Sequence, residues 1–297
     1  MPTLYSSVIR LTNVHPAIFT HLGGQYGHAA FLEIVQSVDP ALSAQLHDAK
    51  GRKPFTVSAL QGLPHGKQGI AHWHCAPAQV SSPQNGSSQR HKQGEVYLRE
   101  GWECWLRVTI LDEKLFSAFI THFLQGAARP QIRLGDAHFL VSEILTTPGS
   151  HPWAGYTTLA DLQTRLEQPA PRKFAFELFS PTQFGYKDDW KIILPLPRFV
   201  FGNLANAWKV LTGEDNVRAV EEYAEANLIF GNYSLKTENA LIENKPHPGA
   251  VGKFEYLLSD PTDQPLARGL NLLADLAFYA GLGRKTPQGM GMASRIS

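Results

Sequence analysis

The sequence predicts an α+β protein built from two units, each with the element order β-α-β-β-α-β. Three observations predict this class. Residues 102–110 alternate apolar and other side chains, which is the period of a strand. Residues 27–38 and 115–123 instead repeat their apolar residues at helical spacing. With 297 residues and 43% hydrophobic content, the chain is large enough for two domains.

In the first half, the predicted elements are a strand, a helix, two strands, a helix and a final strand. They cover residues 4–12, 27–38, 53–60, 102–110, 115–123 and 137–145. Asp39-Pro40 is expected to end the first helix, because proline disfavours helical conformation in the residue before it. A polar insertion at about residues 62–94, rich in Gly, Ser, Gln, Pro and His, is predicted to be a mobile surface loop.

The second half repeats this order after a connecting stretch at residues 146–171. Its strands are predicted at residues 173–179, 227–236, 251–259 and 290–296, and its helices at 201–211, 217–226 and from 265 onward. Ser180-Pro181-Thr182 is expected to break the first strand, residues 194–197 to be extended, and residues 246–249 to form a turn. Asp263 is the expected N-cap of the last helix, before Pro265. The sequence thus predicts two tandem ferredoxin-like (RRM-like) domains, at residues 1–146 and 147–297.

Between the last helix and strand, two Gly-x-Gly units flank five residues that include Arg284, Lys285 and Gln288. Glycine permits positive φ and close approach, while arginine and lysine supply charge and donors for phosphate. A dinucleotide-binding loop is disfavoured because Thr286 stands where its third glycine would be and the loop follows a helix. No window matches a P-loop. By composition alone a flexible C-terminal hairpin is an alternative, but the apolar helix before the loop argues against disorder.

The formal net charge of +1 at pH 7 neither supports nor excludes a nucleic-acid partner, because positive charge can be concentrated on one face. Two cysteines, Cys75 and Cys104, provide no disulfide framework and fit a reducing cytoplasm. We see no signal peptide and no stretch of membrane-spanning length, so a cytoplasmic protein without a membrane partner is expected. His72, His74 and Cys75 lack the usual zinc spacing, and we predict no metal or cofactor.

The doubled fold and the glycine loop together resemble the CRISPR-associated repeat-processing endoribonucleases, Cas family six, of the RAMP superfamily. The most specific part is Gly281-Leu282-Gly283 to Gly289-Met290-Gly291. Supporting parts are Gln45-Leu46-His47-Asp48, Pro54-Phe55-Thr56-Val57-Ser58-Ala59-Leu60, Phe179-Ser180-Pro181-Thr182 and Leu194-Pro195-Leu196-Pro197. The resemblance implies a metal-independent endoribonuclease that cuts CRISPR precursor RNA in the repeat and can retain the product. The ribose 2′-hydroxyl attacks the adjacent phosphorus, leaving a 2′,3′-cyclic phosphate and a 5′-hydroxyl. The implied partners are repeat RNA and a multi-subunit effector complex, with a homodimer left open.

That chemistry needs a base, an acid and a cation for the phosphate charge. The resemblance implies His47 as the catalytic histidine and Lys53 as the cation, with Lys50 and Arg52 as competitors. Tyr26 and His28, at the start of the first helix, are the candidates for a third participant. The resemblance assigns the loop to RNA binding and to packing between the domains, with the RNA contacts at Gly281, Gly283, Arg284, Lys285, Thr286, Gln288, Gly289 and Gly291.

Three alternatives stay open from the sequence. His47 is expected in a loop, and a histidine in a loop is often an inert surface residue. A RAMP-type subunit that holds CRISPR RNA without cutting it would share the fold and the glycine loop, so His47 with Lys53 is the distinguishing feature. A nucleotide-binding protein is the third alternative, disfavoured by the spacing of the loop.

Overall fold

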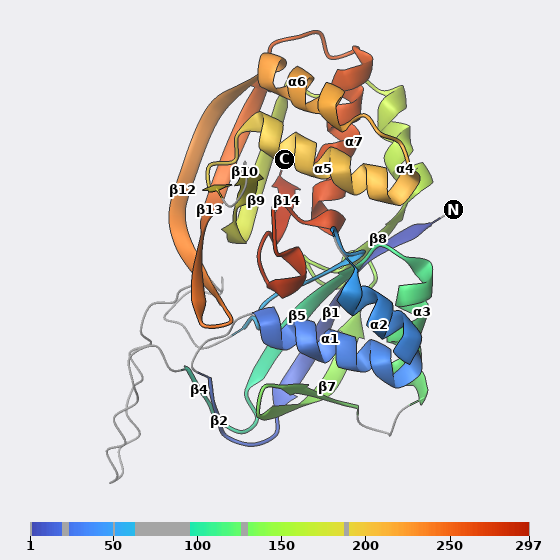
Figure 1. Ribbon diagram of the computed structural model, residues 1–297, viewed down its shortest axis with the longest axis vertical. Coiled ribbons are helices and arrows are strands. Elements are labelled where there is room, and N and C mark those ends of the chain that lie inside the picture. The colour runs from blue at the N-terminus through green and yellow to red at the C-terminus, as the bar shows by residue number, and fades with distance from the viewer. Residues whose placement is uncertain are drawn as a thin grey trace.

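The computed structural model describes residues 2–19, 24–49, 51–62, 96–125, 130–186 and 190–296. Nearly all of the predicted insertion lies outside these residues, and so do Lys50, His72, His74 and Cys75. Figure 1 shows two bodies stacked along the long axis, with the first half of the chain in the lower one and the second half in the upper one. No helix in the described ranges has the length and apolar character needed to cross a membrane.

The lower body is a six-stranded antiparallel sheet with helices packed on it. The strand order is β3-β5-β1-β7-β6, and β8 also pairs with β1. The strands are β1 (Thr3–Asn13), β3 (Phe55–Val57), β5 (Glu103–Ile110), β6 (Gln131–Leu134), β7 (Ala137–Leu145) and β8 (Gly155–Thr158). Its helices are α1 (Gly24–Val38), α2 (Pro40–Asp48) and α3 (Glu113–Gln125), and β2 (Ala17–Phe19) pairs with β4 (Val96–Leu98) at one side. Phe31, Phe55 and Phe119 meet in the core between the helices and the sheet.

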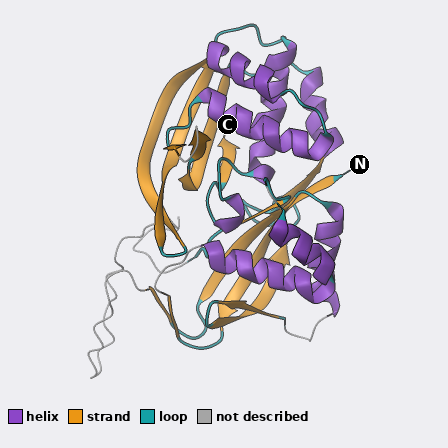
Figure 2. Cartoon of the chain, viewed as in Figure 1, coloured by secondary structure: helices purple, strands orange, loops and turns teal. Residues whose placement is uncertain are grey.

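The upper body is a four-stranded antiparallel sheet of order β12-β13-β9-β14, with helices over one face (Figure 2). Its strands are β9 (Lys173–Thr182), β12 (Leu228–Ile242), β13 (Lys245–Leu258) and β14 (Ala293–Ile296). Its helices are α5 (Pro197–Thr212), α6 (Val217–Asn227) and α7 (Pro265–Ala280). The short elements are α4 (Leu159–Gln163), η1 (Thr164–Glu167), the hairpin of β10 (Phe184–Tyr186) and β11 (Trp190–Ile192), and η2 (Thr286–Gln288). The α+β class is confirmed, and the predicted helices occur within a few residues of their expected bounds.

Helix α2 was not predicted from the sequence. The Asp39 side chain accepts a hydrogen bond from the Leu42 backbone N–H at 2.9 Å, and Pro40 occupies the first turn. Acidic N-cap and proline at the first position are the signals that start a helix. From the sequence, the same two residues are expected only to end α1. His47 therefore lies in the last turn of a helix, and its expected placement in a loop was wrong.

Three boundaries in the second half also differ from expectation. Strand β9 continues through Ser180-Pro181-Thr182 rather than breaking there. The β12–β13 turn lies at Glu243 and Asn244, which have φ of +52° and +60°, and not at residues 246–249. Prolines are tolerated in this part of β13 because its pairing with β9 begins only at Ala250. The residue before α7 is Gln264, which makes no side-chain capping bond, so Asp263 is not the N-cap.

Candidate active site

The glycine loop, residues 281–292, runs from the end of α7 to the start of β14. Gly281, Gly283, Gly289 and Gly291 are buried, with φ between +67° and +91°. A Cβ added to Gly283 would lie 2.3 Å from the Gln183 carbonyl oxygen, and one on Gly291 would lie 2.0 Å from that of Leu282. The missing side chains therefore make room for protein backbone.

The same loop also fits against the first domain. Gly289 forms a parallel bridge with Ser58, which follows β3. Gly24, the first residue of α1, comes so close that its Cβ would lie 2.3 Å from the Gly289 Cα. The loop is thus wedged between the domains, as Figure 1 shows for the red coil above α1. Of the loop side chains, Arg284 is exposed and Lys285 is half-buried.

His47 and Lys53 lie together at the C-terminal end of α2. The His47 side chain is exposed. The Lys53 ammonium donates to the backbone carbonyls of Leu46 and His47, the latter at 2.9 Å. Such carbonyls lack partners within the helix and form the negative end of its dipole, so a cation is stabilised there. Burial lowers the pKa of Lys53, and the nearby Asp48 carboxylate opposes that shift.

His28, on the first turns of α1, lies beneath the glycine loop. Its ring stacks on Phe55 with centroids 5.7 Å apart. Burial lowers its pKa from 6.5, and the charges of Lys53 and His47 add to this, while a hydrogen bond with the Pro287 backbone opposes it. Proline has no backbone N–H, so the Pro287 carbonyl must accept that bond from the imidazole. Within the described residues, Nδ1 of His28 is buried without a hydrogen-bond partner.

The structure therefore brings His28, His47 and Lys53 together but places Tyr26 elsewhere. The Tyr26 ring packs under Gly135, whose Cβ would lie 3.1 Å from the tyrosine Cε1, and it meets Phe19 edge to face. Two residues along a helix correspond to roughly 200° of rotation, so Tyr26 and His28 face different sides of α1. Arg52, the competitor of Lys53, is directed away from His47 to the end of α7.

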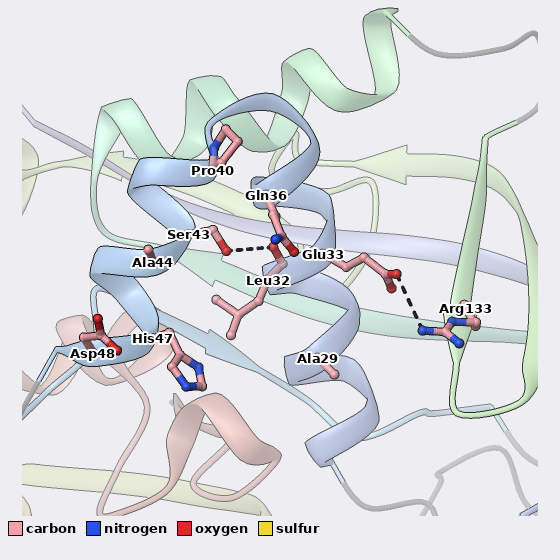
Figure 3. Close-up of a pocket in the computed structure, with 10 residues that line it drawn as sticks. All are labelled: Ala29, Leu32, Glu33, Gln36, Pro40, Ser43, Ala44, His47, Asp48 and Arg133. Carbon is pink, nitrogen blue, oxygen red and sulfur yellow. Dashed lines mark hydrogen bonds and ion pairs between the residues drawn. The ribbon is translucent and has the colours of Figure 1, made fainter.

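A groove of about 500 Å³ runs between α1 and α2 beside His47 (Figure 3). His47 and Asp48 lie at the C-terminal end of α2, and on the side of α1 away from α2 Arg133 forms an ion pair with Glu33 at 3.6 Å. Its remaining lining comes from Ala29, Leu32, Gln36, Pro40, Ser43 and Ala44. None of these had been singled out from the sequence. Their helical spacing would have marked a shared face only if α2 had been predicted. The described residues contain no group of three or more metal-ligating side chains.

The overall fold of this chain, two α+β bodies joined through a buried glycine loop, recurs in solved structures. A solved RAMP protein binding different RNA substrates has this fold, with a TM-score of 0.58 at 14% identity over 99% of this chain and all of the other. Closer likenesses are a Cas6 product complex, with a TM-score of 0.74 and 26% identity over the whole of both chains, and Thermus thermophilus Cas6, with 0.67 and 24% over 100% of this chain and 99% of that one. A search of curated proteins finds no match.

Family models cover most of the chain. The model of the CRISPR Cas6 N-terminal domain matches residues 1–164, and that of the CRISPR-associated endoribonuclease Cas6 matches residues 176–293. The chain belongs to the Cas6 family of CRISPR-associated endoribonucleases. The family expected from the glycine loop is confirmed, and with it the class of enzyme.

Proposed function

We propose that this chain cleaves CRISPR precursor RNA within the repeat by attack of a ribose 2′-hydroxyl on the adjacent phosphorus, without a metal ion. The products are a 2′,3′-cyclic phosphate and a 5′-hydroxyl. The observation that supports this most is the convergence of His28, His47 and Lys53 beside the glycine loop, from three separate segments of the chain. The proposal assigns the base, the acid and the cation to these side chains.

The surroundings of each side chain suggest its role. His47 is exposed and can reach an RNA strand, so we assign it as the base for the 2′-hydroxyl. We assign His28 as the acid for the leaving 5′-oxygen because it is the second histidine at the site. Burial lowers its pKa, so only a minority of the protein carries this proton near pH 7. An ammonium has three N–H donors, and Lys53 directs hydrogen bonds to two carbonyls. The third can serve a phosphate oxygen. Tyr26 has no role in this scheme.

Phosphate binding by the loop is assigned to Arg284 and Lys285. The pKa of Lys285 is lowered by burial and by the charges of Arg284 and Lys191, with Glu243 opposing. This places several cations near one another on a chain with little net charge. The Lys285 ammonium donates a hydrogen bond to the Gln288 side-chain oxygen at 3.2 Å. The buried Thr286 and the four glycines determine the shape of the loop. The partners remain repeat RNA and, as proposals, an effector complex or a second copy of the chain.

We also propose a ferredoxin-like plan for both domains. The orders β3-β5-β1-β7 and β12-β13-β9-β14 support it, because each is second, third, first and fourth strand of its own β-α-β-β-α-β unit. The domain division near residue 147 stays a proposal. Strand β8, at Gly155–Thr158, lies after that division in the chain but pairs with β1 of the first sheet.

One observation favours the alternative of a subunit that holds CRISPR RNA without cutting it. The hydrogen bonds of Lys53 to the Leu46 and His47 carbonyls would cap α2 whether or not the protein is a nuclease. Capping of α2 and RNA binding would then be enough to explain why a lysine occupies position 53. Cleavage has to be measured to separate the two functions.

The test is single-turnover cleavage of labelled repeat RNA in excess EDTA, comparing wild type with His47→Ala and identifying the product ends. We expect a cyclic phosphate from wild type and a loss of about 10²–10⁴-fold in the variant, with RNA binding retained. His15→Ala, an exposed histidine outside the site, is the matched control and should cleave normally. Tight binding without cleavage by wild type would establish the alternative. Equal cleavage by His47→Ala would move the base to His28.

A further inference from the structure

Two arginines of the first domain bind the C-terminal turn of α7, the helix that leads into the glycine loop. Arg107 of β5 donates to the Phe278 carbonyl and, through Nε, to the Ser6 hydroxyl at 2.8 Å. Arg52 donates through Nη2 to the Ala280 carbonyl at 2.5 Å and to that of Gly281 at 3.2 Å. The carbonyl acceptors are uncharged oxygens at the negative end of the α7 dipole. The Ser6 hydroxyl is a further uncharged acceptor. The helix end is therefore clasped from across the domain interface.

The two arginines differ in what else they contact. The Arg107 guanidinium lies against the stacked rings of Trp153 and Phe278, 4.6 Å and 4.4 Å from their centroids. Arg52 instead donates through Nη1 to Oδ1 of Asn203 on α5, at 3.2 Å. Arg107 thus belongs to an aromatic cluster at the interface, and Arg52 belongs to a polar network.

Asn203 extends that network into the glycine loop. Its Oδ1 accepts from the Gly283 backbone N–H at 3.0 Å, and its Nδ2 donates to the Gly283 carbonyl at 3.3 Å. Both backbone groups of Gly283 are thus bonded to one side chain, that of Asn203, which in turn accepts a hydrogen bond from Arg52. Arg52 therefore bears on the position of the loop as well as on the end of α7.

Arg52 precedes Lys53 in the chain, and the two cations bind the ends of two different helices. Arg52 binds the C-terminal end of α7, and Lys53 binds the C-terminal end of α2. This dipeptide connects the helix that carries His47 with the helix that leads to Pro287, whose carbonyl accepts from His28. Movement of either partner would change the distance between the two histidines.

We propose that Arg52 and Asn203 are positioning residues for the cleavage reaction. They act through Lys53 and the glycine loop to hold His28 and His47 at the separation that the chemical step requires. The inference rests on the function proposed above. Arg107, bound to the same helix end but remote from Lys53 in sequence and in contacts, contributes to the stability of the interface.

The test compares Arg52→Lys and Asn203→Ala with Arg107→Lys as the matched control. Lysine keeps the charge but loses the planar fork that reaches several acceptors. Three quantities are measured: the single-turnover rate with protein in saturating excess, the Kd for repeat RNA with a 2′-deoxyribose at the cut, and the Tm.

For Arg52→Lys and Asn203→Ala we expect the saturated rate to fall about tenfold or more, because misplacement of about 1 Å can cost a hundredfold. Their Kd should change by less than about threefold, since the interaction lost acts on the chemical step. The double variant should lose little more than either single one, because both changes break one network. Arg107→Lys should lower the Tm and leave the saturated rate near that of wild type.

Wild-type cleavage by Arg52→Lys and Asn203→Ala would overturn the inference, and so would an equal rate loss in Arg107→Lys at a similar Tm. If Arg52→Lys does not fold, Asn203→Ala decides alone. Tight binding of repeat RNA by wild type without cleavage marks failure of the proposed function. An inactive His47→Ala beside fully active Arg52 and Asn203 variants marks failure of this inference only.

Discussion

His28 and His47 are close together but differ in their surroundings. His47 is exposed on the last turn of α2, whereas His28 is enclosed by Phe55 and by the turn at Pro287. Desolvation disfavours the charged form of an imidazole, so His28 resists protonation in the folded protein. The protonation of His28 is therefore tied to the stability of the fold.

This difference predicts a pH dependence of stability. The pKa of His28 lies below 6.5 in the folded chain and near 6.5 in the unfolded chain, so the unfolded state binds more protons between those values. The contribution of neutral, buried His28 to stability is fully present above about pH 6.5 and is lost as the pH falls toward the folded pKa. His28→Phe keeps a ring against Phe55 but cannot titrate. The fall in Tm from about pH 7.5 to about pH 5.5 should be smaller than in wild type.

The exposed His15 offers the control for that measurement. His15→Phe should keep the wild-type pH dependence of the Tm. An equal fall in Tm for wild type and His28→Phe would show that burial of His28 does not contribute to the acid sensitivity.

At the scale of elements, the glycine loop and α1 form one packed joint. The joint depends on two glycines that face each other, Gly24 at the start of α1 and Gly289 in the loop. Their close approach places the Pro287 carbonyl over His28 on the same helix. Any side chain at this contact would separate the loop from α1.

Gly24→Ala should therefore destabilise the protein, by about 1–3 kcal/mol, because the added methyl group overlaps backbone that cannot move freely. Gly269→Ala in α7 is the matched control, since no atom lies within 4 Å of its added Cβ. There alanine should raise the free energy of unfolding by roughly 0.5–1 kcal/mol through its helix preference. Urea denaturation measures both, and a change of the same sign in the two variants would contradict the packed joint.

At the scale of the whole molecule, the domains share buried contacts. Val8 of β1 lies in one cluster with Trp153 and Met292, and the Trp153 ring packs against Phe179 and Phe278. Arg107 of β5 lies against two of these rings, those of Trp153 and Phe278. We expect the two bodies to unfold together, because neither can separate without exposing this cluster and the arginine.

Thermal unfolding followed by far-UV circular dichroism and by tryptophan fluorescence should give coincident transitions. Arg107→Met should shift both by the same amount, with a loss of about 1–3 kcal/mol from the hydrogen bonds removed. Arg218→Met is the control. Because Arg218 is 91% exposed and its ion pair with Glu222 is screened by solvent, its Tm should stay near that of wild type. A fluorescence transition that precedes the loss of secondary structure would show independent domains.

Local patterns were sufficient for much of the fold. The alternation in residues 102–110 and the apolar spacing in α1, α3, α5 and α6 depend on neighbours in the chain, so the strand and helices could be predicted from them. The glycine loop was recognisable because its spacing is itself the motif. Helix α2 was missed because Pro40 marks both an end and a start, and only Ser43 and Leu46 of the helix are buried. A weak apolar stripe gives little periodic signal.

The sequence by itself determined the α+β class, the family and the identity of His47 and Lys53 as candidates. Only the tertiary structure decided which residues meet. Tyr26 and His28 are two positions apart, and Arg52 and Lys53 are adjacent. Composition cannot tell which member of each pair faces the site. The pairing of β12 with β13 likewise continues past Pro246 and Pro248 to the turn at Glu243 and Asn244, which the prolines did not indicate. Periodicity is a property of adjacent residues, whereas the joint between Gly24 and Gly289 brings together atoms from opposite ends of the chain.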